Sequence, residues 1–402
     1  MRKISLLMVW IILFVTACGG GDSKQELIHQ SGKLISARQV AEYSNNSIQV
    51  SGVEIKYPVK VYRLVYETKG VDGEFLNASG LLTIPQKSAK EKSPILIYHH
   101  GTIYNNRHAP TENIRIDSSS VLPAFVGFIA VAPDYIGYGE SLGHLHPYLN
   151  AKITASSSVD LLRAARQYLK NNDIGTNDQL FLGGYSQGGG ATIATQRLIE
   201  NELPDEFTVT ASSAGAGSYN LSKELLDSTA EALQDYDNYI VTRPSNIGLI
   251  FKAMDDAYNL AILDKIFQSS YASVVESIYD GSHNSDFIDK QLSKDANKLI
   301  KKDFLERLVN GDEKALVDAF KDNDVFDWTP KVPTRLYHGR DDDWVNFYHA
   351  QTAYDTMIDN GATQLELVEC VVADNQLTNH ANCFDPYLLS SYEFFSQFAN
   401  DL

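Results

Sequence analysis

One serine in this 402-residue chain has the surroundings of a nucleophile. Ser186 lies in the segment LFLGGYSQGGGATIATQRLIE, with five glycines close to it. The five residues centred on it read Gly-Tyr-Ser-Gln-Gly, a G-x-S-x-G pattern that holds a serine on a tight turn between a strand and a helix. Side chains beside such a turn would collide with the strand and the helix, so the glycines are expected as a packing requirement. The pattern predicts that the hydroxyl of Ser186 attacks a carbonyl carbon; the alternative is a purely structural turn.

The segments around Ser186 alternate between strands and helices. The apolar runs PILIYHHG, FIAVAPDY, QLFLGGYS and FTVTASSAG predict buried strands. Helical sequences lie between them, including VLPAFVGF and SSSVDLLRAARQYLKNN, which is expected to be capped by its serines. The alternation predicts βαβ crossovers and a parallel sheet, preceded by an antiparallel hairpin of KVYRLVYETKG and EFLNASGLLTIP.

Several turns resemble those of the α/β-hydrolase superfamily. YHHGT, DYIGYGES and GYSQGG follow three of the predicted strands, and the resemblance runs from about Tyr62 to the C-terminus. HHGT, YHGRDDDWV and NHANC are similar to the branch of secreted lipases and bacterial lipoprotein esterases. The resemblance implies an α/β-hydrolase fold, a mostly parallel central sheet flanked by helices with a helical cap insertion. The core is expected over 34–219 and 329–402, and the cap over 220–328, where apolar residues recur at helical spacing.

The resemblance also selects an acid. In HGRDDDWV, the family pattern His-Gly-x-x-Asp-x-x-Val selects Asp342, three residues before Val345. Asp341 is the main substitute, and Asp341 and Asp343 are expected to be solvated neighbours of the acid.

The base must follow the acid, because the chain order in this superfamily is serine, acid, histidine. Only His349 and His380 lie beyond Asp342. His349 falls in a helical sequence and is expected to be an ordinary surface or core residue. His380 lies in LTNHANC, between the last strand and the last helix, and is assigned as the base.

The resemblance places the oxyanion-binding groups on the backbone. The N–H of Thr102, after a His-Gly turn, and the N–H of Gln187 would bind the oxyanion. No metal or organic cofactor is expected, because no ligand spacing relates the nearby histidines. These histidines are His99 and His100, which are expected to shape the turn, together with His144 and His146.

The N-terminus has the layout of an export signal. MRKISLLMVWIILFVTACGGG begins with basic residues, continues with an apolar run too short to span a bilayer comfortably, and reaches small residues at Cys18. VTAC resembles the lipobox of bacterial lipoproteins, which implies removal of residues 1–17, acylation of Cys18 and a tether over 18–33. Gly19 after the cysteine resembles lipoproteins sent to the outer membrane. The alternative is a cleaved secretory peptide without a lipid anchor.

Two further cysteines, Cys370 and Cys383, flank the predicted base. In an exported protein such a pair predicts a disulfide, which would fasten the loop of His380; two buried thiols are the alternative.

Charge narrows the choice of partners. The formal net charge is −17, which argues against a nucleic-acid partner. The expected activity is hydrolysis of carboxylic esters through an acyl-enzyme. A serine peptidase of the prolyl type and a non-catalytic surface binding lipoprotein are the competing hypotheses.

Overall fold

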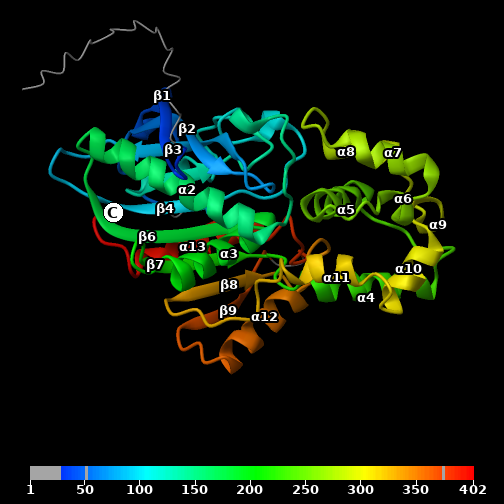
Figure 1. The fold of residues 1–402 in the computed structure, drawn as a ribbon. Helices are drawn as coiled ribbons and strands as arrows, with labels where there is room; N and C mark the ends of the chain where they lie inside the picture. Colours follow the sequence, from blue (N-terminus) through cyan, green and yellow to red (C-terminus); the bar gives the residue numbers. More distant parts are fainter. Residues whose placement is uncertain (1–28, 50–52, 374–375) are drawn as a thin grey trace, which may run out of the picture.

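A nine-stranded sheet organises the part of the chain that the structure describes (Figure 1). The structure is a computed structural model that describes residues 29–49, 53–373 and 376–402. The order is β1-β2-β3-β5-β4-β6-β7-β8-β9. The pairs β1–β2, β2–β3 and β3–β5 are antiparallel, and every other pair of neighbours in this order is parallel. The strands are β1 (Leu34–Tyr43), β2 (Val59–Lys69), β3 (Phe75–Pro85), β4 (Ser93–His99), β5 (Ile129–Pro133), β6 (Thr176–Tyr185), β7 (Val209–Gly215), β8 (Thr334–His338) and β9 (Leu365–Glu369).

Helices cover both faces of the sheet. The two faces differ because successive residues of a strand point in opposite directions. Ile95 and Ile97 of β4 pack with α2, whereas Leu96 between them packs with Phe395 of α13. The helices are α1 (Leu122–Phe125) and α13 (Phe384–Ser396) on one face, and α2 (Ala151–Asn171), α3 (Gln187–Glu202) and α12 (Tyr348–Asp359) on the other.

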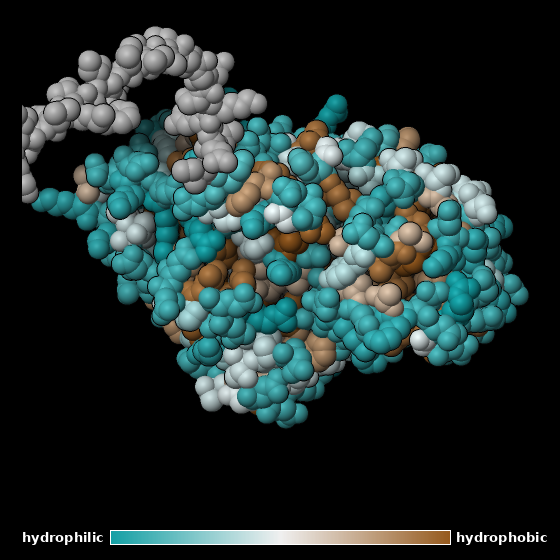
Figure 2. All heavy atoms as spheres, in the orientation of Figure 1, coloured by the Kyte–Doolittle hydropathy of each residue, from teal (hydrophilic) through white to brown (hydrophobic). Residues whose placement is uncertain are grey.

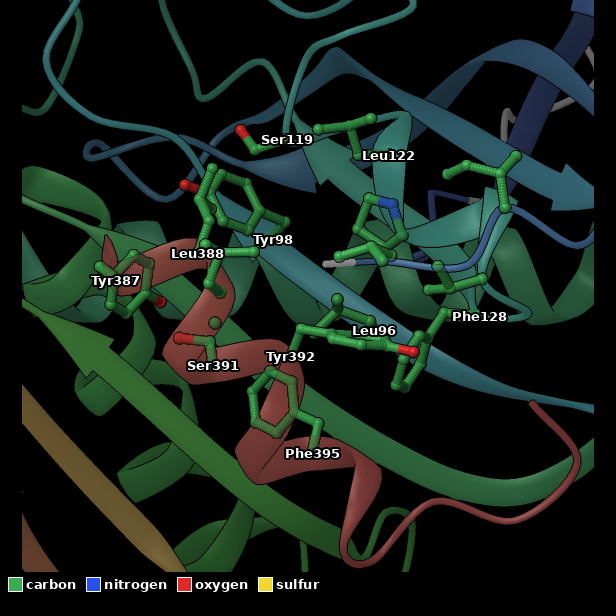
Figure 3. Close-up of a pocket in the computed structure, with 16 residues that line it drawn as sticks. Leu96, Tyr98, Ser119, Leu122, Phe128, Tyr387, Leu388, Ser391, Tyr392 and Phe395 are labelled. Carbon is green, nitrogen blue, oxygen red and sulfur yellow. The ribbon is translucent and has the colours of Figure 1, made fainter. Parts of the chain in front are cut away.

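Helix α1 is short and leaves a gap beside α13. An apolar cavity of about 110 Å³ lies there, and Figure 3 shows Leu96 and Tyr98 of β4 facing α13 across it. Gly183 of β6 also lines the cavity, but Ser186 does not. The cavity therefore belongs to the packing of the sheet against α1 and α13.

The segment between β7 and β8 is helical and has a core of its own. Its apolar cluster includes Phe251, Phe267 and Phe304. In Figure 1 these helices lie to one side of the sheet, and Figure 2 shows hydrophobic residues along the middle of the molecule and a mainly hydrophilic outer surface. They are α4 (Leu221–Gln234), α5 (Pro244–Tyr258), α6 (Leu263–Ile266), α7 (Ser269–Ile278), α8 (Ser285–Gln291), α9 (Ala296–Leu299), α10 (Lys302–Val309) and α11 (Lys314–Lys321).

Two features differ from the sequence expectations. Helix α2 begins earlier than expected and is capped by Asn150, whose side chain accepts a hydrogen bond from the N–H of Ile153. The serines expected as caps lie inside the helix; the Ser158 hydroxyl donates to the carbonyl of Thr154. Strand β1 was not expected, because its mostly exposed sequence LISARQVAEY mixes polar and apolar residues, as is typical of a sheet edge.

The N-terminal expectations fall mostly outside the described residues. The predicted signal peptide 1–17, Cys18 and the first part of the tether lie there. The remaining part of the predicted tether, residues 29–33, is bonded to the domain: the side chain of Gln167 in α2 donates to the carbonyl of Gly32. No helix within the described residues is long and apolar enough to cross a membrane.

Polar contacts join α4 to α12. Glu224 of α4 accepts a hydrogen bond of 2.8 Å from the hydroxyl of Tyr348, and its carboxylate lies 3.3 Å from Nε2 of the buried His349. Burial alone would raise the pKa of Glu224, but the hydrogen bonds from His349, Ser228 and Tyr348 and the charge of His349 lower it to about 2. The ionised carboxylate is therefore the form that holds α4 against α12.

This contact predicts a dependence of stability on pH. The pKa of Glu224 is lowered from 4.5 to about 2 in the folded protein, so the unfolded chain binds more protons between these values. The free energy of unfolding should rise with pH through this window and fall when the pH drops toward 2. Urea titrations from pH 2 to 6 should show a shallower rise for Glu224→Gln than for the wild type. Glu112→Gln, at an exposed position away from α4, is the control; equal slopes for both variants would contradict the prediction.

Candidate active site

Ser186 occupies the turn between β6 and α3 with a strained backbone. Its φ is 62° and its ψ is −123°, a conformation that costs free energy in a residue with a side chain. Its N–H donates to the carbonyl of Gly215, and its own carbonyl accepts from the N–H of Gly189. The turn is therefore held by the neighbouring strand β7 and by the start of α3.

Three of the five surrounding glycines are required by close backbone packing. A Cβ added at Gly184, Gly188 or Gly189 would overlap a backbone oxygen of an adjacent segment. At Gly183 and Gly190 the nearest atoms would be 3.5 and 3.3 Å away, so a methyl group meets less resistance there. The expectation that all five glycines are a packing requirement was wrong for Gly183, which faces the cavity beside α13.

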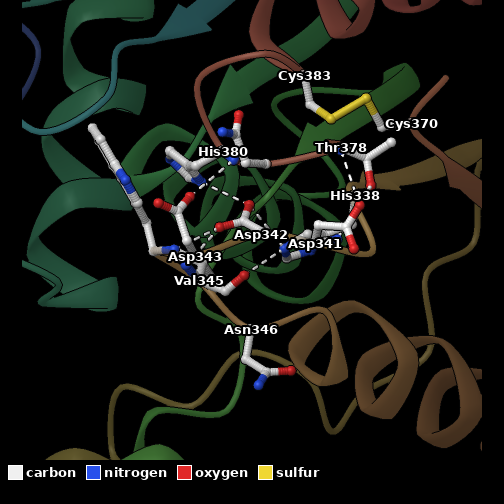
Figure 4. Close-up of polar contacts among 12 residues, drawn as sticks. His338, Asp341, Asp342, Asp343, Val345, Asn346, Cys370, Thr378, His380 and Cys383 are labelled. Atoms are coloured by element: carbon white, nitrogen blue, oxygen red, sulfur yellow. Dashed lines mark hydrogen bonds and ion pairs between the residues drawn. A yellow bond between two sulfur atoms is a disulfide. The ribbon is translucent and has the colours of Figure 1, made fainter. Parts of the chain in front are cut away.

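His380 and Asp342 form a buried hydrogen-bonded pair (Figure 4). Nδ1 of His380 lies 2.7 Å from Oδ2 of Asp342, and the Asp342 side chain is fully buried. Oδ1 of the same carboxylate accepts hydrogen bonds from the N–H groups of Trp344 and Val345 at 2.9 and 2.8 Å. The carboxylate is thus fixed from both oxygens.

Hydrogen bonds keep Asp342 ionised. Burial alone would raise its pKa, but hydrogen bonds from His338 and His380, the charge of His380 and the N–H of Val345 hold the pKa well below its ordinary value. His338 also donates from Nε2 to the carbonyl of Val345 at 2.8 Å. A permanently charged carboxylate at this position favours the tautomer of His380 that carries a proton on Nδ1.

The other two aspartates of the run were expected to be solvated neighbours, but both bond to the loop of His380. Oδ2 of Asp341 accepts hydrogen bonds from the N–H and hydroxyl of Thr378 at 3.0 and 2.9 Å. Asp343 accepts a long hydrogen bond of 3.4 Å from the N–H of His380. A disulfide between Cys370 and Cys383 closes the same loop (Figure 4).

Tyr185 connects the His380 loop to the turn of Ser186. Its hydroxyl donates to the carbonyl of His380 at 2.8 Å, and its ring lies 5.0 Å from the imidazole. Nε2 of His380 is buried and has no hydrogen-bond partner among the described residues. Within the described residues, no hydrogen bond joins Nε2 of His380 to Ser186. In enzymes without substrate, hydrogen bonds between catalytic groups are often long and shorten only when substrate binds.

The two residues expected at the oxyanion site lie near Ser186. A Cβ built on Gly101 would be 3.6 Å from Cβ of Ser186, so the turn that leads to Thr102 lies against the serine. The hydroxyl of Thr102 hydrogen-bonds to that of Tyr148 at 2.8 Å. Gln187 is the first residue of α3.

His146 is a neighbour of this site to which sequence reasoning gave no role. Nε2 of His146 lies 3.2 Å from the side-chain nitrogen of Gln187, and its Nδ1 lies 2.8 Å from the carbonyl oxygen of Ile136. Burial lowers the pKa of His146 to about 4, so it is neutral at pH 7 and can accept the Gln187 hydrogen bond. Three tyrosine rings pack around it, those of Tyr135, Tyr138 and Tyr148, and all come from the same loop.

His99 and His100 shape the turn, as expected. Nδ1 and Nε2 of His99 hydrogen-bond to the hydroxyls of Thr192 and Thr195 in α3, and burial lowers its pKa to about 3. His100 hydrogen-bonds to the carbonyls of Gly101 and Asp134. Within the described ranges no three side chains gather as a metal site.

Comparisons with known proteins agree with this architecture. The sequence matches the secretory lipase family over residues 105–383, and none of the curated proteins compared with it matches. A mutant of LipA, a rice cell wall degrading esterase from Xanthomonas oryzae, is 26% identical with a TM-score of 0.79, over 91% of this chain and 97% of that chain. Two other structures show the fold alone. A putative hydrolase from Legionella pneumophila is 23% identical with a TM-score of 0.78, over 91% of this chain and 98% of that chain. Candida antarctica lipase A in its closed state is 16% identical with a TM-score of 0.66, over 93% of this chain and 84% of that chain.

The sheet order, the turn at Ser186 and these structural neighbours define an α/β-hydrolase. The chain belongs to the secretory lipase family, whose match covers more than half of its length, and it is a carboxylic ester hydrolase. This membership indicates an exported protein.

The glycine packing at the turn leads to a prediction. Gly188→Ala should lower the free energy of unfolding by about 1–3 kcal/mol or more, because its Cβ would overlap the carbonyl oxygen of His99. Gly183→Ala should change it by less, because its Cβ would meet Tyr387 at an ordinary 3.5 Å. Urea unfolding of the two variants gives the comparison. Equal losses would mean that close backbone packing is not what selects glycine at this turn.

Proposed function

We propose that this ester hydrolase works through a triad in which Ser186 is the nucleophile, His380 the general base and Asp342 the acid. The observation that carries the proposal is the buried 2.7 Å contact between His380 and Asp342, which leaves Nε2 of the same ring without a protein partner. The strained turn of Ser186 supports the role of the serine, since such backbone strain is concentrated at functional sites.

The chemistry is acyl transfer to water. Nε2 of His380 takes the proton of the Ser186 hydroxyl while the serine oxygen attacks the ester carbonyl. The oxyanion accepts hydrogen bonds from the N–H groups of Gln187 and Thr102, each of which contributes about 3 kcal/mol in comparable enzymes. His380 then protonates the leaving alcohol, and water attacks the acyl-enzyme by the same route. Asp342 orients the imidazole and stabilises its charged form.

The α4–α11 helices are proposed to roof this site and to set the length of acyl chain that it accepts. A hydrogen bond close to Thr102 supports this proposal. Tyr104, two residues after Thr102, donates it to Asn246 of α5. The oxyanion turn and these helices are therefore in direct contact.

We also propose that the protein is a bacterial lipoprotein, acylated at Cys18 and held at the outer membrane by the tether that follows. The sequence pattern VTAC and the family's exported character support this.

Hydrolysis of p-nitrophenyl esters from acetate to palmitate tests the proposal, using the domain without residues 1–18. Ser186→Ala and His380→Ala should reduce turnover to near background. Asp342→Asn should lower kcat by about 10⁴-fold, because the amide favours the wrong tautomer of the imidazole. Asp341→Asn and Asp343→Asn are matched controls, and each should cost far less.

Other outcomes discriminate between the alternatives. Turnover that persists in Ser186→Ala would remove the serine from the mechanism. Labelling of Ser186 by a fluorophosphonate without hydrolysis of any ester would favour a peptidase. Absence of both would favour a binding protein. A larger loss in Asp341→Asn than in Asp342→Asn would move the acid to Asp341.

A further inference from the structure

Trp344 is a large aromatic side chain that is 46% exposed and yet packs on the imidazole of His380. The two ring centroids are 4.6 Å apart and the planes differ by 19°, so the rings are stacked. The N–H of Trp344 also donates to Oδ1 of Asp342 at 2.9 Å. One residue therefore contacts the base through its ring and the acid through its backbone.

A second aromatic contact on His380 comes from Tyr185. The Tyr185 ring lies 5.0 Å away and is tilted by 49°. The hydrogen bond between Nδ1 and Asp342 anchors one edge of the imidazole but leaves the ring free to rock about that contact. Contacts with two other rings restrict this rocking, and the direction of Nε2 depends on it.

A cation from the α4–α11 helices covers Trp344. The guanidinium of Arg243, the residue that precedes the first turn of α5, lies 3.0 Å from the centroid of the Trp344 ring. Cations favour the faces of aromatic rings, and Trp is the preferred partner. The Arg243 guanidinium has no hydrogen bond or ion pair with other described side chains, although Asp343 and Asp289 are near enough to interact with its charge. The indole is thus its closest defined contact.

We propose that Trp344 is a positioning residue for His380, and that Arg243 holds Trp344 in its stacked position. Arg243, Trp344 and His380 form one stack that couples the α4–α11 helices to the base. Movement of α5 away from the core would release the indole and let the imidazole rock, so the enzyme is fully active only when these helices are seated. This inference rests on the proposed role of His380.

The variants Trp344→Leu, Trp344→Phe and Arg243→Ala test the stack. Trp344→Leu should lower kcat for p-nitrophenyl acetate by about 10- to 100-fold, the scale of a misplaced catalytic group, while KM changes little. Trp344→Phe keeps a flat ring and should recover most of the loss. Arg243→Ala should lower kcat less than Trp344→Leu does.

The double variant shows whether Arg243 acts through Trp344. If it does, Arg243→Ala should cost nothing further in the Trp344→Leu background, because neighbouring residues that act together are not additive. Matched controls are Leu377→Ala, an exposed apolar side chain on the His380 loop, and Arg38→Ala on the exposed edge strand; both should keep the wild-type kcat. Thermal unfolding of every variant confirms folding.

Three results would overturn the inference. The first is an unchanged kcat in Trp344→Leu. The second is a change confined to KM that grows with acyl-chain length, which would make Trp344 a substrate contact. The third is full additivity of the two substitutions. His380→Ala separates these failures from failure of the proposed function: if it abolishes turnover while Trp344→Leu leaves kcat unchanged, His380 stands and the stack fails. If His380→Ala retains turnover, the proposed function itself fails.

Discussion

The close approach of three backbone segments around Ser186 is the constraint on which the rest of the site depends. The start of α3 lies against the end of β4 through Gly188 and against the end of β7 through Gly189. This packing places the turn of Ser186, the residue Gln187 and the loop that leads to Thr102 within one small volume. A sheet whose central strands are buried on both faces supplies the rigidity that keeps a strained serine in position.

The His380 side of the site is held by polar contacts instead. β9 and α13 are joined by a loop that has little apolar burial of its own; Val371 and Leu377 are largely exposed. Hydrogen bonds to Asp341, Asp342 and Asp343 and a disulfide give it order. The three aspartates therefore act together on this loop. The carboxylate of Asp342 bonds the imidazole of His380, and those of Asp341 and Asp343 bond the backbone of Thr378 and His380.

The α4–α11 helices have an apolar cluster of their own and meet the rest of the molecule through both apolar and polar contacts; Leu249 and Ala253 of α5 pack with Tyr148. Glu224 bonds to α12, and Arg243 lies over Trp344. Such contacts contribute less free energy than a continuous apolar core and are sensitive to pH and salt.

The parallel sheet and the helical segment between β7 and β8 could be predicted from local patterns in the sequence. The roles of Ser186 and His380 stay predictions: Ser186 rests on the pattern of its glycine-flanked turn, and His380 rests on the chain order of the superfamily. A continuous apolar run reads as a buried strand, and a glycine-flanked serine after such a run reads as a tight turn. Asp342 was selected by family resemblance and not by its own surroundings, since three adjacent aspartates look alike in sequence.

The separate contacts of the three aspartates depend on the tertiary structure, because their partners Thr378 and His380 lie more than thirty positions further along the chain. The contact of His146 with Gln187 and the stack of Arg243 on Trp344 join segments from separate elements, and no periodicity within one element reports such contacts. Strand β1 was missed for a related reason: an edge strand is defined by the neighbour with which it pairs, and most of its own residues are exposed.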